Sequence, residues 1–300
     1  MTCGDAVKAC HAHALAGTYF DLVDVDSFGS DSRFVGAALE CVRHDGGLLY
    51  VTSTDGLAAG GHRTMRSWAM YGSFTRPVPS ANEHQLRALT AHAVREAAAR
   101  GLRARPLFSL YAAHGPVWRV MLRVERTRAG SLPCESEVGY ASHCSACGEA
   151  GQVGMDALGA GYTGTCNACG AAGALTLSGP MWLGPMHDEA HVAELRRRAL
   201  DCGWAKADGD VDQRRLARLI DSMAEECVEG IAHIASYYKV TNVLKGQGLR
   251  GTPSVSKLVR ALRDAGHAAC VSHVSTEAVK TTASVADIVK AAALLVGERE

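Results

Sequence analysis

The chain has 300 residues, of which 47% are hydrophobic, so it is long enough for about two domains with apolar cores. Lysine and arginine together number 31, as do aspartate and glutamate, which excludes a uniformly basic nucleic-acid-binding chain but allows a local basic face. No apolar run approaches the roughly 20 residues of a membrane span, and no basic region followed by an apolar core opens the sequence, so we expect an intracellular protein without membrane contacts.

The first 127 residues have the pattern of alternating strands and helices. Strands are expected at residues 19–26, 48–54, 106–111 and 117–124. Helices are expected behind residues 30–32, which offer N-cap side chains, and between Asn82 and Gly101, where apolar residues recur at helical spacing. The break between the last two strands is short, so they are predicted to be antiparallel neighbours. This order of elements predicts an α/β domain over residues 1–127.

The remaining residues divide into two parts. Residues 128–178 are rich in Gly, Ala and Cys and have few large apolar side chains, which predicts a loop-rich insertion. Helices are then expected at 188–202, 211–230, 254–265 and 284–296, with a short strand at 268–274. Residues 179–300 are therefore predicted to form a second domain of small, mixed α and β elements.

Two C-x-x-C pairs stand out among the eleven cysteines, a number that favours a reducing compartment and a metal over disulfides. Eighteen residues separate Cys144 and Cys147 from Cys166 and Cys169, which is the spacing of structural zinc sites. Each pair can direct two thiolates at one ion, and four protein ligands leave no open position for catalysis. Because the segment has little apolar surface, the metal would also supply folding free energy. The alternative is four unrelated buried cysteines.

The end of the first strand is the main candidate for chemistry. Asp26 is followed by Ser27 and Phe28, and open α/β sheets bind ligands beyond the carboxyl ends of their strands. The carboxylate and the neighbouring backbone carbonyl can each accept a hydrogen bond from an exocyclic amine, which would direct the nitrogen lone pair at an electrophilic methyl group. Phe28 offers a face on which an extruded base can stack. A helix-capping role for Asp26 and core packing for Phe28 explain the local sequence equally well.

Several separated stretches make the chain resemble the tRNA guanosine-26 N2-dimethyltransferase family, which methylates guanosine 26 of tRNA. They are Phe20–Gly29 with residues 47–55, Tyr71-Gly72, Glu83 with Leu86-Arg87, residues 106–109, Gly179–Pro185 after the cysteine pairs, and His273 with Val279-Lys280-Thr281. The match is collinear from about residue 3 to residue 282. The resemblance implies part of a Rossmann-like class I methyltransferase sheet, followed by a zinc-containing α+β C-terminal domain, with S-adenosylmethionine as methyl donor.

The resemblance also implies roles for individual residues. Asp26 takes the place of the catalytic aspartate, with the Ser27 carbonyl beside it, and Phe28 that of the aromatic residue beside the target base. Asp5 and Ala6 match the pair that contacts the adenine of S-adenosylmethionine. The family's metal-binding cysteines are matched by Cys144, Cys147, Cys166 and Cys169.

Two departures from the family pattern matter. Most members have proline at the position of Ser27, and serine, which a plant-like branch shares, keeps the carbonyl acceptor while it loosens the turn. The family's N-terminal segment, with the first three strands and the glycine-containing turn for the cofactor, has no counterpart in the sequence. We therefore expect the strand at 19–26 to be an exposed edge, and the chain to be a fragment or a truncated gene model.

Together these observations predict an S-adenosylmethionine-dependent tRNA guanine N2-methyltransferase. Residues 128–178 would hold a structural zinc ion and residues 179–300 would bind tRNA. The alternative function is a catalytically inactive, zinc-containing tRNA-binding protein. The arginine clusters at 196–198 and 214–218 could contact phosphates or form a solvated, ion-paired face. Nothing in the sequence indicates an obligate protein partner.

Overall fold

The structure, a computed structural model, describes residues 3–127, 135–159 and 162–297. A four-stranded sheet with the order β1-β2-β4-β3 forms its N-terminal part. The strands are β1 (Leu22–Asp26), β2 (Asp45–Ser53), β3 (Leu102–Ala112) and β4 (Val117–Arg126). β1 and β2 are parallel, and β4 runs antiparallel to both of its neighbours, so the predicted strands and the predicted antiparallel pair are confirmed.

Two helices of the N-terminal part, α2 (Ser32–Cys41) and α5 (Ala81–Ala98), cover one face of this sheet. The other helices of this part are α1 (Ala6–Leu15), α3 (Gly56–Ala59) and α4 (Thr64–Tyr71). Leu39 of α2 and Leu89 of α5 are fully buried against Leu49 and Leu122 in the core that these elements share with the sheet. Each such side chain contributes roughly 1.5–3 kcal/mol of transfer free energy. The apolar stripes of α2 and α5 therefore fix the side of the sheet on which both helices lie.

The opposite face of the sheet is only partly covered, and β1 lies at its edge. Residues directly paired across strands point to the same face, so Asp26, Thr52 and Arg119 share this second face. In the part of the chain that the structure describes, β1 pairs with β2 alone, and Leu22 is 50% exposed. The expected exposed edge is thus observed.

A second, smaller sheet follows residues 128–134, which lie outside the described residues. It has the order β6-β5-β7 and is antiparallel, with β5 (Val138–Cys144), β6 (Ala150–Gly154) and β7 (Leu175–Trp182). A 3-10 helix (Glu135–Glu137) precedes it, and α6 (Met155–Gly159) follows β6. The prediction of a loop-rich insertion is therefore wrong. The strands form through backbone pairing, with few of the large alternating side chains by which a strand is recognised in a sequence. The predicted boundary at residue 178 falls inside β7.

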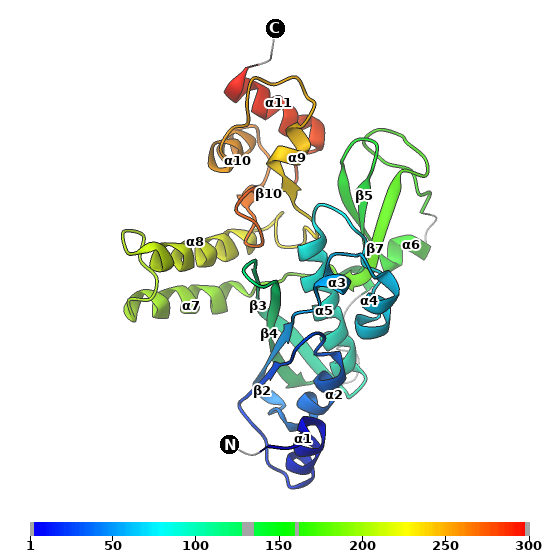
Figure 1. The fold of residues 1–300 in the computed structure, drawn as a ribbon, viewed down its shortest axis with the longest axis vertical. Helices are drawn as coiled ribbons and strands as arrows, with labels where there is room; N and C mark the ends of the chain where they lie inside the picture. Colours follow the sequence, from blue (N-terminus) through cyan, green and yellow to red (C-terminus); the bar gives the residue numbers. More distant parts are fainter. Residues whose placement is uncertain (1–2, 128–134, 160–161, 298–300) are drawn as a thin grey trace.

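The C-terminal residues form a helical hairpin and a small α+β unit. The hairpin consists of α7 (Glu189–Asp201) and α8 (Val211–Glu226) and projects to one side of the molecule (Figure 1). The unit contains β8 (Tyr238–Lys239), α9 (Val240–Leu244), α10 (Val255–Asp264), β9 (Ala269–Val271), β10 (Ala278–Thr281) and α11 (Val285–Val296). Its sheet has the order β8-β10-β9. The four predicted helices of this region are confirmed as α7, α8, α10 and α11. Among all described helices, none has the length and apolar character needed to cross a membrane.

A buried cluster of charged side chains joins the parts. Nζ of Lys280 on β10 lies 2.8 Å from a carboxylate oxygen of Glu83 on α5 and 2.6 Å from one of Glu226 on α8. Arg87 pairs with Glu83 at 2.8 Å. Burial opposes ionisation, but the charges of His273 and Lys280 hold the pKa of Glu226 well below its ordinary value. The cluster therefore fixes the C-terminal unit against the N-terminal helices.

Candidate active site and metal centre

Asp26 and Phe28 lie exposed at the carboxyl end of β1. The Phe28 side chain is fully exposed, so it does not pack in the core. The Asp26 carboxylate is 58% exposed and lies 3.5 Å from Nη2 of Arg119, which reaches the same face from β4. Neither Asp26 nor its carboxylate caps α2, whose N-cap residue is Asp31. The structural roles that competed with chemistry for Asp26 and Phe28 are thus not observed.

The turn after β1 is anchored to the end of β2. The backbone N–H of Gly29 donates to Oγ1 of Thr54 at 2.7 Å, and the Thr54 N–H donates to the Gly29 carbonyl at 2.8 Å. Oγ of Ser53 contacts the same carbonyl at 3.4 Å and lies 2.7 Å from the Tyr71 hydroxyl. Gly29 has a positive φ of 79°, which glycine adopts without strain. These bonds fix the backbone that presents Ser27 and Phe28.

Asp31 comes shortly after this turn and is fully buried. It occupies the N-cap position of α2, but its side chain makes no capping hydrogen bond. Of residues 30–32, Ser30 provides the expected capping chemistry, because its Oγ accepts a hydrogen bond from the backbone N–H of Ser32 at 3.2 Å. Neither carboxylate oxygen of Asp31 has a hydrogen-bond partner among the described residues. Burial raises the pKa of Asp31 to about 7. A buried carboxyl group that titrates near neutral pH therefore follows the candidate catalytic turn closely in sequence.

A cavity of about 230 Å³ lies beside β1 and joins two sets of predicted residues. Ala6 of the predicted cofactor pair lines it together with Asp26 and Ser27. The rest of the lining is Val7, Cys10, Val23, Asp24, Val25, Phe34, Ala37 and Ala38, so the cavity is mainly apolar and Asp24 and Asp26 are its two acidic residues. Burial and the neighbouring Asp26 raise the pKa of Asp24.

Asp5 does not line this cavity. Its carboxylate accepts a hydrogen bond from the backbone N–H of Lys8 at 3.0 Å and so caps α1. This bond lowers the pKa of Asp5. Of the predicted pair, the structure brings Ala6 to the cavity and uses the Asp5 side chain to begin the helix that carries Ala6.

The four predicted metal-ligating cysteines meet at one point. The Sγ atoms of Cys144 and Cys169 are 3.8 Å apart, and those of Cys147 and Cys166 are 3.7 Å apart. A tetrahedral ion with bonds of about 2.3 Å requires sulfur atoms about 3.8 Å apart. Each pair is followed by a glycine of positive φ, Gly148 or Gly170, whose N–H bonds back to the carbonyl of the first cysteine. The arrangement therefore fits a tetrahedral structural ion.

Without a cation between them, the four thiols do not all ionise at the same pH. Hydrogen bonding from the backbone N–H of Cys147 lowers the pKa of Cys144 to about 7. Burial and the neighbouring thiols raise the pKa of Cys147 to about 12. A divalent cation would allow all four cysteines to ionise, because it stabilises the four thiolates together.

A second group of potential ligands is already bonded to protein groups, except for Nδ1 of His187, which has no hydrogen-bond partner among the described residues. His187, Glu226 and His273 lie within metal-ligand reach of one another and are all buried. Glu226 accepts hydrogen bonds from the backbone N–H of His273 at 2.8 Å and from Lys280 at 2.6 Å. An added divalent ion would meet the Lys280 ammonium on the same carboxylate. We therefore interpret this group as part of the buried charge cluster.

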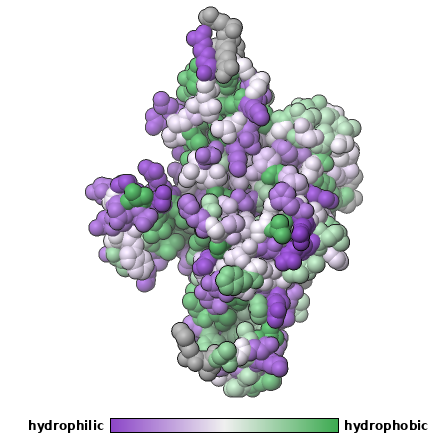
Figure 2. Space-filling model, viewed as in Figure 1, coloured by the Kyte–Doolittle hydropathy of each residue, from purple (hydrophilic) through white to green (hydrophobic). Residues whose placement is uncertain are grey.

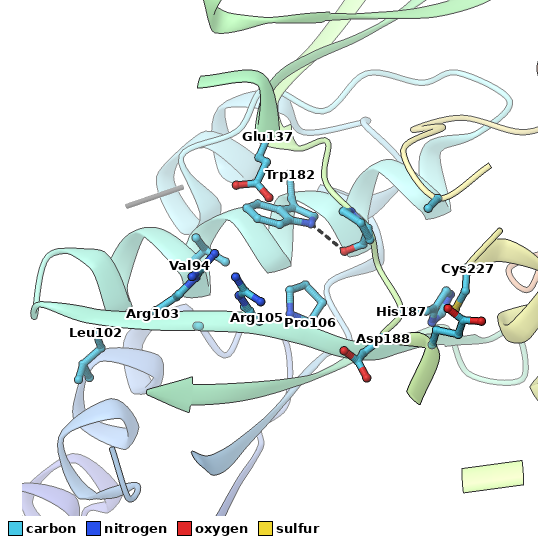
Figure 3. Close-up of a pocket in the computed structure, with 14 residues that line it drawn as sticks. Val94, Leu102, Arg103, Arg105, Pro106, Glu137, Trp182, His187, Asp188 and Cys227 are labelled. Atoms are coloured by element: carbon cyan, nitrogen blue, oxygen red, sulfur yellow. Dashed lines mark hydrogen bonds between the residues drawn. The ribbon is translucent and has the colours of Figure 1, made fainter. Parts of the chain in front are cut away.

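A different cavity, of about 330 Å³, lies along β3 and is shown in Figure 3. Its wall includes Arg103, Arg105, Trp182, His187 and Asp188. β3 is the edge strand opposite β1, so this cavity is separated from Asp26 by the width of the sheet. Although it is larger than the cavity beside β1, it contains none of the residues predicted for chemistry.

The arginine-rich hairpin α7–α8 is internally paired. Arg196 bonds to Asp221 at 2.8 Å, and Arg197 and Arg198 bond to Glu194 at 2.8 and 2.6 Å. Residues 188–226 contain ten acidic and seven basic residues. The geometry favours the solvated, ion-paired interpretation of these arginines over phosphate contacts.

Sequence reasoning missed several residues that shape the site. Arg119, Thr54 and Tyr71 are far from Asp26 in sequence. The register of β1, β2 and β4 brings Arg119 and Thr54 near the turn, and Tyr71 reaches it from α4 through Ser53. The alternation of apolar and polar residues in 117–124 indicated that Arg119 points away from the core. No signal in the sequence distinguished it from Arg123, which lies on the same face.

Comparison with known proteins gives one family. A family model described as N2,N2-dimethylguanosine tRNA methyltransferase matches residues 3–293. Two archaeal proteins named tRNA (guanine(26)-N(2))-dimethyltransferase are similar to the chain, from Haloarcula marismortui (29% identity, 96% of this chain, 71% of that protein) and Natronomonas pharaonis (31%, 93% and 69%). The protein of that name from Schizosaccharomyces pombe is 26% identical over 93% of this chain and 51% of its own length. The chain thus spans about half to seven tenths of these relatives.

A solved structure has the same fold. It is that of Trm1 from Pyrococcus horikoshii in complex with S-adenosyl-L-methionine, with a TM-score of 0.73 and 22% sequence identity. The match covers 94% of this chain and 68% of that one. The likeness supports a methyltransferase-type sheet for the N-terminal part.

Proposed function

The chain belongs to the N2,N2-dimethylguanosine tRNA methyltransferase family, and on this premise we propose that it methylates the exocyclic N2 of guanosine 26 in tRNA, with S-adenosylmethionine as methyl donor. The main structural support for this proposal is the set of residues that line the cavity beside β1. It brings Ala6, which matches the family's adenine-contacting pair, together with Asp26 at the position of the catalytic aspartate. Phe28, fully exposed two residues further on, is free to stack on a base.

The chemistry proposed for these residues is positioning. The Asp26 carboxylate and the Ser27 carbonyl accept hydrogen bonds from the two N–H groups of the guanine N2 amine, and Phe28 stacks on the extruded base. S-adenosylmethionine supplies the electrophilic methyl group when bound. As the new N–C bond forms, the bond between this methyl group and the donor sulfur breaks, the donor leaves as a neutral thioether, and Asp26 takes the proton that N2 loses. Holding the amine in line accounts for most of the rate enhancement, since such orientation is worth several kcal/mol.

We further propose that the cysteine centre holds a structural zinc ion. Cys144, Cys147, Cys166 and Cys169 supply four thiolates, so no coordination position remains for a substrate. The ion joins the turn after β5 to the turn before β7. It thereby adds to the small apolar core of this sheet, in which Ala141 and Met181 are buried.

We assign each proposed activity to one part of the chain. Residues 1–127 carry the methyl-transfer site, residues 128–178 the zinc centre, and residues 179–300 a unit that binds tRNA through its surface outside the ion-paired α7–α8 hairpin. A second function, tRNA binding without catalysis, is favoured by the position of β1, which pairs with β2 alone in the described residues and so leaves one edge beside the cavity without a strand.

Incubation with unmodified tRNA and methyl-labelled S-adenosylmethionine distinguishes the two functions. Methylation predicts labelled N2-methylguanosine or N2,N2-dimethylguanosine in the digested tRNA. Saturable tRNA binding without any labelled nucleoside would instead support the non-catalytic function.

A further inference from the structure

A surface of basic and large apolar side chains lies next to the candidate catalytic turn. It is formed by α3, α4 and the loop that follows them, and we call it the α3–α4 platform. Its residues are Leu57, Arg63, Met65, Trp68 and Arg76, all of them exposed. Figure 2 shows hydrophobic and strongly hydrophilic residues side by side over the region where Figure 1 places α4.

The charge of the platform has one sign. Residues 56–82 contain three arginines and one histidine but no aspartate or glutamate. Arg66 is paired with Asp55 at 2.6 Å, just outside this segment. Within the described residues, no ion pair is found for Arg63 or Arg76, so both guanidinium groups remain available to an anionic partner. The α7–α8 hairpin differs, because four of its arginines, Arg196, Arg197, Arg198 and Arg215, are paired with its own acids.

The platform is held rigidly. Oγ1 of Thr64 donates to the Thr75 carbonyl at 3.1 Å, which joins the start of α4 to the loop beyond its end. Gly61 packs so closely on the backbone of Arg76 that a Cβ there would lie 2.2 Å from the Arg76 carbonyl carbon. These contacts bring Arg63 and Arg76 to the same end of α4 although thirteen positions separate them in sequence.

Trp68 presents an aromatic face on this support. It is 48% exposed, and its inner face stacks on Phe74, with ring centroids 6.1 Å apart and planes 20° from parallel. Phe74 is itself fixed by two backbone hydrogen bonds to Gly179 on β7, at 2.8 and 3.1 Å. The Trp68 ring is therefore already oriented before a ligand arrives, and stacking on it costs little conformational entropy.

The platform adjoins the catalytic turn through a short chain of contacts. Gly29 is bonded to Thr54, as described above, and the next residue, Asp55, caps α3 and pairs with Arg66. A nucleic acid that placed a base on Phe28 would therefore have its neighbouring nucleotides close to the platform.

We propose that the α3–α4 platform binds the RNA strand next to the target guanine, with Trp68 stacking on a nucleobase and Arg63 and Arg76 contacting phosphates. This inference rests on the proposed function for the identity of the RNA. The pairing of cationic side chains with an exposed aromatic ring is the chemistry by which proteins hold unpaired nucleotides. Sequence-independent contacts of this kind fix the register in which the target base reaches Asp26.

The test measures the affinity of the chain for unmodified tRNA by fluorescence anisotropy over a series of salt concentrations. Trp68→Ala is expected to weaken binding roughly tenfold or more, as stacked bases generally do when the aromatic ring is removed. Arg63→Gln with Arg76→Gln is expected to reduce the slope of log Kd against log salt by about 1.4–1.8, which is the loss of two phosphate contacts. Trp204→Ala and Arg197→Gln with Arg215→Gln, on the α7–α8 hairpin, are matched controls and should change neither quantity.

The possible outcomes separate this inference from the proposed function. Trp68→Phe keeps an aromatic face and should restore most of the affinity, which excludes a folding defect as the cause of loss. If platform and hairpin variants bind tRNA equally well, the platform assignment is overturned while methylation remains possible. If the wild-type chain binds no tRNA, both the platform and the proposed function are contradicted.

Discussion

Nη2 of Arg119 lies 3.5 Å from Oδ2 of Asp26, and the two side chains reach the same face of the sheet from β4 and β1. The Arg119 guanidinium also lies over the ring of Tyr50, 5.6 Å from its centroid. This contact limits the motion of Arg119, and the ion pair in turn limits the orientations of the half-exposed Asp26 carboxylate. Arg119 is therefore a positioning residue for the proposed reaction.

Replacing Arg119 by Gln should lower kcat for methyl transfer about tenfold and leave the KM for tRNA nearly unchanged, because Asp26 would adopt more orientations while the tRNA contacts stay. Steady-state kinetics with unmodified tRNA measure both constants. Arg123→Gln is the control, since Arg123 lies on the same strand and face but forms no ion pair with Asp26. Equal rates for the two variants would contradict a role for the Arg119–Asp26 pair.

Asp31→Asn should stabilise the protein in a pH-dependent manner. The pKa of Asp31 is about 7 in the folded protein, against an ordinary value of 3.8, so the folded state binds more protons than the unfolded chain between these values. The free energy of unfolding therefore falls as the pH rises from about 4 to 7. Asn cannot ionise and avoids this loss.

Urea unfolding at two pH values measures the effect of Asp31→Asn. The variant should exceed the wild type by roughly 2–4 kcal/mol at pH 8 and differ little from it at pH 4.5. A difference of the same size at both pH values would show that the Asp31 carboxylate is not the buried group that titrates.

Lys280→Met should destabilise the protein by about 3–5 kcal/mol, because it leaves the carboxylates of Glu83 and Glu226 buried without their shared cation. Denaturant unfolding measures the loss. Lys290→Met removes an exposed lysine from α11 and should cost less than about 0.5 kcal/mol. Similar losses for the two variants would mean that the buried cluster does not hold the C-terminal unit in place.

The cysteine centre should contain one zinc ion per chain, measurable by atomic emission on purified protein. Cys147→Ser should lose the ion and, in hydrogen-exchange measurements, the protection of β5–β7, because that sheet has few large apolar contacts of its own. Cys202→Ser, an exposed cysteine of the α7–α8 hairpin, should retain both. Protein that carries no metal and still protects β5–β7 would contradict a structural ion.

The sequence predicted the elements whose apolar residues recur regularly. β1 to β4 and the helices α2, α5, α7, α8, α10 and α11 all bury an apolar stripe or run, and that periodicity is visible without a structure. The sheet β6-β5-β7 was not predictable in this way, since Gly139, Ala141 and Gly151 leave no large alternating side chains. Its strands form through backbone pairing and the cysteine turns.

The candidate site was predictable where residues are close in sequence. Asp26, Ser27 and Phe28 form one turn, and the four cysteines have a diagnostic spacing, so both groups were identified before the fold was known. The Arg119–Asp26 pair and the anchoring of Gly29 by Thr54 depend on strand register, which local patterns do not determine. The capping role of the Asp5 carboxylate likewise became evident only from its bond to Lys8.

The most direct measurement compares methyl transfer by the wild type and by Asp26→Ala, with the modified nucleotide located in the tRNA by nuclease mapping and mass spectrometry. We expect the label on N2 of guanosine 26, and we expect Asp26→Ala to lower its rate at least a hundredfold with tRNA affinity unchanged. Asp21→Ala, at the opposite end of the same strand region, should keep the wild-type rate. Transfer by Asp26→Ala at the wild-type rate, or a label confined to other nucleotides, would contradict the assignment of Asp26 as the residue that holds the target amine.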